Sequence, residues 1–282
     1  MRIFDVFPIA NELDVLEVRL ETLKNAVDAF VVYEWSTDYR GNPKPMYLRE
    51  RLEEFSSRFP NLIYVPFDKE VTQPGFEGER IQRDTVKRVL NDLCQAGDSI
   101  IYSDIDEIPR PEAVSVASNM IRRGVPIVHF AQDFFMYYFN LREVTGTLQS
   151  FTGEYPRMDQ PKWLGSRMLP LRTLRDVTMS ELRYPQFKEH GKRVADGGWH
   201  FSWVGSEKPR PAVDRTLEKV RHYHSHLEQL NFAIEFRVRW RVKRRKDVWG
   251  RPGVRFEVAP LADLPEYVVR NAHKFSYALL PT

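Results

Sequence analysis

Two carboxylates, Asp104 and Asp106, stand two positions apart directly after a short apolar run, Ser99–Tyr102. A run of this kind between a helical pattern and a turn predicts a buried strand. In open α/β sheets, ligands bind beyond the carboxyl ends of the strands. Two carboxylates in a turn at that place can both reach one cation, and oxygen ligands suit Mg²⁺ or Mn²⁺. The alternative is a solvated acidic turn that caps the next helix, but the buried strand in front of the pair favours a metal site.

Further polar residues stand at the ends of neighbouring predicted elements. Arg80 and Arg83 begin a predicted helix, Glu79–Ala96, where backbone N–H groups also favour anions. They are expected to hold a diphosphate, although ordinary arginines of a helix surface would look the same. Glu34 follows a run of β-formers, and its carboxylate can accept from ribose hydroxyls or from a base N–H. A polar turn after a strand explains Glu34 equally well.

The elements that position these residues follow from alternating strand and helix patterns over residues 1–131. The expected strands are Ile3–Phe7, Ala29–Tyr33, Leu62–Val65, Ser99–Ser103 and Ile127–Phe130, and the expected helices are Leu13–Leu23, Tyr47–Phe59, Glu79–Ala96 and Pro111–Arg123. Such alternation predicts an α/β fold with a mostly parallel central sheet flanked by helices. Residues 132–282 are predicted to form an irregular extension of the same domain, with a strand at Trp199–Val204 and an interrupted helix at Asp214–Phe236.

Composition excludes several classes of protein. The chain has 282 residues, of which 42% are hydrophobic and 29% charged, as in a folded globular protein. A formal net charge of +3 does not by itself imply a nucleic-acid partner. The single cysteine, Cys94, cannot form an intrachain disulfide and is expected to be a small core residue. No apolar stretch approaches the length of a transmembrane helix, and no signal peptide is expected, so we expect a cytoplasmic protein without a transmembrane segment.

A basic run, Arg237–Lys246, contains seven basic residues in ten positions. Apolar residues alternate with the basic ones up to Lys243, which favours a strand with one basic face, although the same residues could form a helix. Such a run with an aromatic residue can meet a phosphate backbone, an anionic membrane surface or an acidic acceptor. A solvated face without a partner is the alternative.

Several motifs, in order along residues 1–232, resemble glycosyltransferase family 17, which includes β-1,4-mannosyl-glycoprotein β-1,4-N-acetylglucosaminyltransferases. The matching segments are Ile3–Pro8 with Asn11–Asp14, Gly41–Pro45, Asp104–Pro109, Gly197–Ser202, and Lys219 followed by His224 and His226. The resemblance implies a GT-A-type, Rossmann-like fold, in which residues 1–131 bind the nucleotide sugar and residues 132–282 form the acceptor side. It implies a UDP-sugar donor, expected to be UDP-N-acetylglucosamine, and inversion at the anomeric carbon.

The resemblance also assigns roles to single residues. Asn11, Glu12 and Asp104 are expected near the nucleotide sugar, together with the residues named above. A late histidine, either His224 or His226, is expected to complete the metal shell that Asp104 and Asp106 begin.

An inverting transfer needs a carboxylate base near the acceptor hydroxyl. Asp196 is the first candidate, and Glu228 and Glu154 are alternatives. Trp199, His200 and Trp203 are expected on the acceptor side, where a tryptophan can stack on a sugar ring, although core packing is an equal alternative for each tryptophan.

The sequence thus predicts a metal-dependent inverting glycosyltransferase that moves a sugar to a hydroxyl of a glycan or other acceptor. A nucleotidyltransferase or metal phosphohydrolase would also use paired aspartates, but would normally add further carboxylates or a Gly-rich phosphate loop. A carbohydrate- or nucleic-acid-binding protein is a third reading, and it gives no reason for the Asp104 and Asp106 pair.

Overall fold

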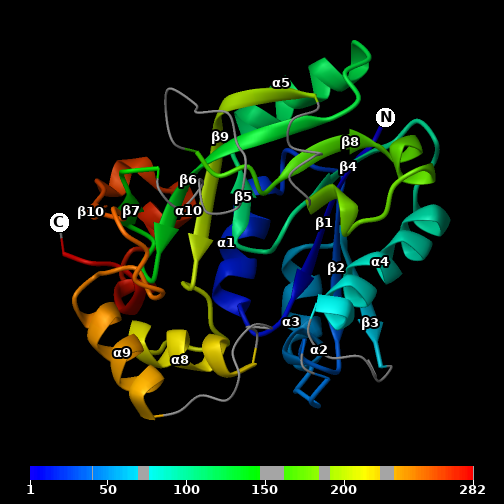
Figure 1. Cartoon of the computed structure of the whole chain (residues 1–282). Coiled ribbons are helices and arrows are strands. Elements are labelled where there is room, and N and C mark those ends of the chain that lie inside the picture. Colours follow the sequence, from blue (N-terminus) through cyan, green and yellow to red (C-terminus); the bar gives the residue numbers. More distant parts are fainter. Residues whose placement is uncertain (40, 69–75, 147–161, 184–190, 223–231, 282) are drawn as a thin grey trace.

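A computed structural model of the chain describes residues 1–39, 41–68, 76–146, 162–183, 191–222 and 232–281. Within these ranges one ten-stranded sheet forms the centre of the molecule, with helices on both faces (Figure 1). Its strands are β1 (Ile3–Ile9), β2 (Ala29–Trp35), β3 (Leu62–Phe67), β4 (Ser99–Tyr102), β5 (Glu107–Pro109), β6 (Val128–Met136), β7 (Leu141–Glu143), β8 (Arg167–Pro170), β9 (Lys192–Ser202) and β10 (Phe256–Val258). The helices are α1 (Leu13–Leu23), α2 (Tyr47–Glu50), α3 (Leu52–Arg58), α4 (Phe76–Leu93), α5 (Pro111–Arg122), α8 (Ala212–His222), α9 (Phe232–Lys243) and α10 (Glu266–Arg270).

The N-terminal part of the sheet is parallel, in the order β4-β1-β2-β3. Side chains alternate between the two faces of these strands, as the twofold period of a strand requires. One face packs on α1 and α5 through residues such as Phe7 and Val32. The other face packs on α4 through residues such as Val6 and Val31. The α/β architecture predicted from the alternating pattern is therefore confirmed.

The C-terminal part continues the same sheet with mostly antiparallel pairs. β8 pairs with β4, β6 with β8, β7 with β6 and β10 with β7, while β9 runs parallel to β6 and also pairs with β5. β6 runs without a break through residue 131, so the expected boundary between the two halves falls inside a strand. A third apolar cluster joins β6 to α8 and α9.

The C-terminal residues close back onto α1, the helix that follows the first strand. The Tyr277 hydroxyl donates to Asp14 at 2.6 Å, and the Tyr267 hydroxyl donates to Glu17 at 2.7 Å. Lys274 forms an ion pair with Glu17 as well. These contacts join residues more than 240 positions apart, so the two ends of the chain belong to one packed unit.

Most predicted elements appear within a few residues of their expected bounds, but β9 begins seven residues before the expected strand Trp199–Val204, and three other elements differ. The expected helix Tyr47–Phe59 is divided at Arg51 into α2 and α3. β6 continues through the aromatic residues after Gln132, which the sequence analysis left irregular. The basic run forms the end of helix α9 and the turn after it, so the strand interpretation was wrong and the helical alternative is correct. Among the described residues, no helix is long and apolar enough to cross a membrane.

Asp98 joins the starts of β4 and β1. Its carboxylate accepts from the backbone N–H of Arg2 at 2.9 Å, from the Arg2 guanidinium at 2.7 Å and from the N–H of Gln95 at 2.9 Å. Burial alone would raise the pKa of Asp98, but the Arg2 hydrogen bonds outweigh it and lower the pKa to about 2. A lowered folded-state pKa contributes stability that is present above the unfolded pKa and is lost as the pH falls.

Asp98→Asn is therefore expected to lower the free energy of unfolding by about 1 kcal/mol at pH 7, a value reduced for the half-exposed Arg2 partner. The difference from the unmodified chain should shrink as the pH falls from about 4 towards 2, because the unmodified carboxyl is then protonated as well. Urea unfolding at pH 7, 4 and 3 measures it, with the exposed Asp92→Asn as control. A difference that stays constant with pH would contradict the assignment.

Candidate active site

A cleft of about 230 Å³ opens at the carboxyl ends of β1, β2 and β4. This is the position at which parallel strands of open α/β sheets present ligand-binding residues. Its walls come from the ends of these strands, from α4 and from α8, and are formed by Pro8, Ile9, Ala10, Glu12, Trp35, Thr37, Asp38, Tyr39, Lys44, Glu79, Gln82, Arg83, Asp104, Ile105, Asp106 and Lys219. The two predicted metal-binding aspartates therefore face the same cleft as Glu12 and Arg83.

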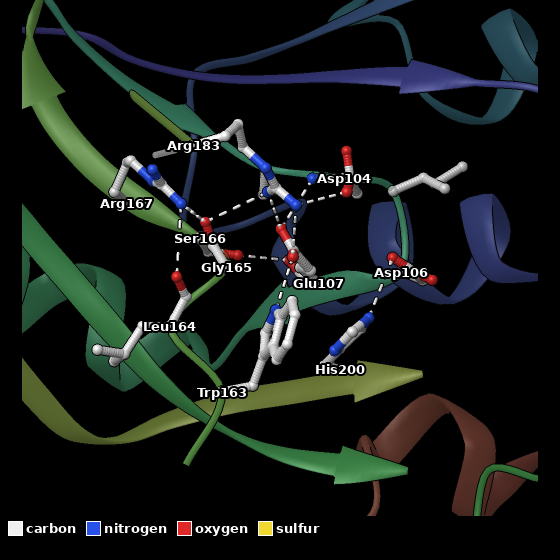
Figure 2. Close-up of polar contacts among 12 residues, drawn as sticks. Asp104, Asp106, Glu107, Trp163, Leu164, Gly165, Ser166, Arg167, Arg183 and His200 are labelled. Carbon is white, nitrogen blue, oxygen red and sulfur yellow. Dashed lines mark hydrogen bonds and ion pairs between the residues drawn. The ribbon is translucent and has the colours of Figure 1, made fainter. Parts of the chain in front are cut away.

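Asp104 lies between two arginines that come from different parts of the chain. Arg83 of α4 donates to Oδ1 of Asp104 at 2.7 Å. Arg183 donates to Oδ2 at 2.6 Å (Figure 2). Arg83 is itself held by Glu79, one helical turn earlier. Burial alone would raise the pKa of Asp104, but the positive charges of Arg183 and Arg83 outweigh it and keep the pKa below its usual range. Asp104 is therefore ionised at neutral pH.

Asp106 has longer contacts with its cationic neighbours. Its carboxylate lies 3.7 Å from Nε2 of His200 and 3.6 Å from Nζ of Lys219. Lys219 also lies 3.6 Å from Glu12, so α8 brings one ammonium group between two carboxylates. Burial alone would lower the pKa of Lys219, but Asp106 and Glu12 outweigh it, so the pKa is raised and the ammonium stays charged.

Glu107 lies behind the two aspartates and is fully buried. Its carboxylate accepts from the backbone N–H of Asp104 at 2.9 Å, from the Trp163 indole at 2.7 Å and from Arg183 at 2.6 Å (Figure 2). A side chain at Gly165 would place its Cβ 1.9 Å from this carboxylate, so only glycine fits there. Glu107 thus fixes both the turn that carries Asp104 and the arginine that pairs with it.

Arg19 of α1 supports the same turn from inside the core. It is fully buried and forms a two-pronged ion pair with Asp5 of β1, at 2.8 and 2.6 Å. Its third nitrogen donates to the backbone carbonyls of Asp104, Ile105 and Glu107 at 2.9 to 3.1 Å. A buried arginine is tolerated because every charge is paired and hydrogen-bonded. The path of the aspartate turn is therefore set by Arg19.

Comparison with protein families gives a match over residues 1–161, more than half of the chain, to glycosyltransferase family 17. The chain belongs to glycosyltransferase family 17. The Asp104–Pro109 segment, one of those that carry the resemblance, lies in the matched region and provides Asp104 and Asp106 to the cleft.

Among curated relatives, the beta-1,4-mannosyl-glycoprotein 4-beta-N-acetylglucosaminyltransferases of Homo sapiens and Rattus norvegicus are 27% and 28% identical to this family 17 chain over 221 residues. Each alignment covers 72% of this chain and 40% of the relative. The chain therefore spans about 40% of the length of these relatives.

Solved structures of other proteins superpose on much of the chain. One is 4-diphosphocytidyl-2C-methyl-D-erythritol synthase from Anaerococcus prevotii, which has a TM-score of 0.41 and 10% identity, with 86% of this chain and 96% of that chain covered. Another is a mycobacterial protein, which has a TM-score of 0.42 and 16% identity, with 96% of this chain and 88% of that chain covered. Superpositions at this level place no further constraint on the site.

The aspartate pair of this family 17 chain offers a divalent ion two carboxylates from one turn. Mg²⁺ and similar ions commonly use one or two carboxylates and complete their shell with waters and substrate phosphates. Asp106 is the more available ligand, because its cationic neighbours lie beyond hydrogen-bonding distance while both oxygens of Asp104 accept from arginines. In the described part of the chain no third Asp, Glu, His or Cys joins the pair to form a metal-binding group. His224 and His226 lie outside the described residues.

Three of the residues predicted to bind the nucleotide sugar have other contacts. Glu34 is fully buried and accepts from the N–H groups of Leu48 and Arg49 at the start of α2, so its oxygens are already used within the fold. Arg80 is half-exposed, pairs with acidic residues of its own helix and does not line the cleft. Asn11 is buried beside Glu12 and also does not line the cleft.

Most of the described residues that were predicted to act as the base or to bind the acceptor lie away from the cleft. Asp196 has a largely exposed carboxylate that pairs with Arg110, away from the cleft, so the geometry does not support it as the base. Trp199 does not line the cleft. It packs in the apolar cluster of α1 and α5, and its indole donates to the carbonyl of Asp263. Trp203 is buried in the third apolar cluster, with Lys219 5.9 Å from its ring. Glu228 and Glu154 lie outside the described residues.

His200 is the exception among these residues. Its ring is packed against Trp163 and Phe134, with centroid distances of 4.6 and 4.7 Å, and its Nε2 faces Asp106. His200 therefore lies beside Asp106, as Figure 2 shows, although it does not itself line the cleft.

Sequence reasoning missed Arg19, Arg183 and Glu107 as site residues, and it noted Lys219 without giving it a role. Arg183 and Lys219 come from the half of the chain assigned to the acceptor, more than 75 positions from Asp104. No local pattern marks such partners. Glu107 carried a signal, because it directly follows Asp106, and so did Arg19, because a single arginine stands on the otherwise apolar side of α1.

A larger cavity, of about 810 Å³, lies at the opposite end of β1, between α1, α5 and α10. Its walls include Ile3 at the start of β1 and Arg110 at the start of α5, but neither aspartate. Its position at the amino ends of the parallel strands separates it from the active-site candidate.

Arg19→Met is expected to lower the free energy of unfolding by about 3–5 kcal/mol, because it leaves Asp5 as an unpaired buried charge. The double variant Arg19→Met/Asp5→Leu removes both charges and should recover most of that loss. Urea unfolding of the two variants measures the difference. Equal stability of the single variant and the unmodified chain would show that the pair does not hold the aspartate turn.

Proposed function

We propose that this chain is a metal-dependent inverting glycosyltransferase that moves N-acetylglucosamine from UDP-N-acetylglucosamine to a hydroxyl of a glycan or other acceptor. The observation that carries the proposal is the cleft beyond β1, β2 and β4, in which Asp104 and Asp106 lie beside Arg83 and Lys219. Family membership and the names of the curated relatives support the sugar and the reaction.

The charges of the cleft suit a diphosphate donor. Arg83 and Lys219 line it, and Arg183 reaches Asp104 from behind. Hydrogen-bond donors and cations that are in place before the reaction stabilise the charge that develops on a leaving group. This electrostatic stabilisation is usually the largest contribution to catalysis. These three cations would hold the negative charge of the departing UDP. A divalent ion held by Asp104 and Asp106 would add positive charge at the same diphosphate.

The acceptor hydroxyl must lose a proton as it attacks the anomeric carbon, and a carboxylate base is the expected means. The carbon–oxygen bond to UDP breaks as the new glycosidic bond forms on the opposite face, so no covalent intermediate with the enzyme is required. Glu228 and Glu154 remain predictions for the base, because they lie outside the described residues. Asp196 remains a third prediction, with an exposed position that speaks against it.

Asp106→Asn is expected to lower kcat by at least about 100-fold, the scale of a lost electrostatic contribution to catalysis, and Asp104→Asn to lower it less. The order follows from Asp106 being the carboxylate less engaged with arginines. Transfer of sugar from UDP-N-acetylglucosamine, followed with and without Mn²⁺, measures the effect. Release of UDP identifies a glycosyltransferase, whereas release of pyrophosphate would identify a nucleotidyltransferase.

Two carboxamide variants serve as controls for this experiment. Asp176→Asn changes an exposed carboxylate far along the chain and should leave turnover unchanged. Asp196→Asn should lower kcat by less than about threefold, on the general expectation for surface substitutions. Wild-type turnover of the Asp104 and Asp106 variants would overturn the metal-site proposal, and a folded but inactive Asp196→Asn would restore Asp196 as the base.

UDP is expected to bind more tightly than GDP or CDP in the presence of Mn²⁺, and Lys219→Met is expected to weaken UDP binding by about 10-fold or more. The loss corresponds to one charge-assisted hydrogen bond to phosphate. Isothermal calorimetry measures both effects, with the exposed Lys192→Met as the matched control. Tighter binding of GDP or CDP would contradict the donor assignment, and unchanged binding by Lys219→Met would remove that residue from the diphosphate site.

A further inference from the structure

Helix α9 carries an exposed aromatic pair, which is unusual for a surface helix. Phe236 is 61% exposed and Trp240 is 41% exposed. They stand four positions apart and therefore on the same face of the helix. The opposite face buries Val238 and Val242 in the third apolar cluster, so α9 is anchored to the fold and presents its aromatic face to solvent.

Basic residues surround this pair. Arg237, Lys243, Arg244, Arg245 and Lys246 are all exposed, and none of them forms an ion pair with another described residue. We call these five residues with Phe236 and Trp240 the α9 patch. Its five positive charges exceed the net charge of +3 of the whole chain, so the remaining residues are slightly negative in sum. The patch is therefore a local positive field on an otherwise nearly neutral chain.

From this arrangement we infer that the α9 patch docks the protein on an anionic lipid surface. Interfacial helices combine Lys and Arg with Trp and Phe, so that the rings enter the headgroup region and the cations meet lipid phosphates. Figure 1 shows α9 at the outer edge of the molecule, packed on α8, where a flat surface can approach it.

The state of Trp240 favours lipid over a nucleic acid or an acidic glycan. Arg244 and Lys246 already lie over its ring, at 5.0 and 5.2 Å from the centroid. A base or a sugar would need that ring face for stacking. At a lipid surface the same arrangement needs no change, because the cations meet phosphates while the indole stays beside them. Phe236 offers no hydrogen bond to a polyanion, but it gains from burial among acyl chains.

The inference is independent of the proposed function, because no residue of the α9 patch lines the cleft. It is tested by co-sedimentation of the full chain with vesicles of phosphatidylcholine, with or without 30 mol% phosphatidylglycerol, at about 0.1 M salt. Binding should require the anionic lipid and should weaken at 0.5 M salt, because the Debye length then falls below its value of about 10 Å at 0.1 M.

Two patch variants separate charge from apolar burial. Lys243→Ala/Arg244→Ala/Arg245→Ala should weaken binding by about 100-fold, at about fivefold for each basic residue near the surface. Phe236→Ser/Trp240→Ser should weaken it by about 10-fold through lost apolar contact. The matched controls, Arg88→Ala/Arg122→Ala/Arg123→Ala and Val116→Ser, change exposed residues of α4 and α5 and should bind as the unmodified chain does.

Absence of binding to anionic vesicles would overturn the inference, and so would equal losses in patch and control variants. If the chain binds heparin or an oligonucleotide but not vesicles, and the charge variant loses this binding, the partner is a polyanion and the lipid inference is wrong. Hydrolysis of UDP-N-acetylglucosamine should be the same in the patch variants and the unmodified chain. Vesicle binding can therefore be interpreted even if the proposed activity is not found.

Discussion

The buried ion pair between Arg19 and Asp5 fixes the part of the structure on which the site depends. Asp5 belongs to β1 and Arg19 to the helix that follows it, so the pair sets the position of α1 on the sheet. The remaining donors of Arg19 hold three carbonyls of the aspartate turn. A buried pair is weak evidence for stability, because desolvation offsets most of the attraction. The pair matters here for geometry, because the hydrogen bonds of Arg19 fix the backbone conformation of the turn that carries Asp104 and Asp106.

Charge compensation is the second constraint. Asp104, Asp106 and Glu107 follow one another closely in a buried turn, where their mutual repulsion would otherwise favour protonation. Arg183 lies between Asp104 and Glu107, and Lys219 lies beside Asp106. The two cations come from the second half of the sequence, so the site is complete only when both halves of the chain are folded together.

The sequence predicted the parallel half of the sheet well, because each strand and helix there carries its own apolar period and an obvious turn. It also singled out Asp104 and Asp106, because they directly follow a run that reads as a buried strand. It could not identify Arg183 or Lys219, because their relation to Asp104 and Asp106 depends on how residues far apart in the chain pack. The role of Glu34 stayed open for a related reason: a carboxylate at the end of a strand can serve a ligand or the next helix, and only the fold shows that the N–H groups of Leu48 and Arg49 donate to it.

The basic run shows why periodicity alone failed in one place. Val238 and Val242 fit both the alternation of a strand and the four-residue spacing of a helix. Basic residues alternate with the apolar ones from Arg237 to Lys243, so they do not distinguish a strand from a helix either. A strand would place Phe236, Val238, Trp240 and Val242 on one face, whereas the helix buries the two valines in the third apolar cluster and leaves the two aromatic residues exposed. The helix thus places Phe236 and Trp240 together on the face that points away from the cluster, at the edge of the molecule (Figure 1). Only the helical geometry therefore presents both aromatic rings to solvent beside the exposed basic residues while α9 stays anchored by its valines.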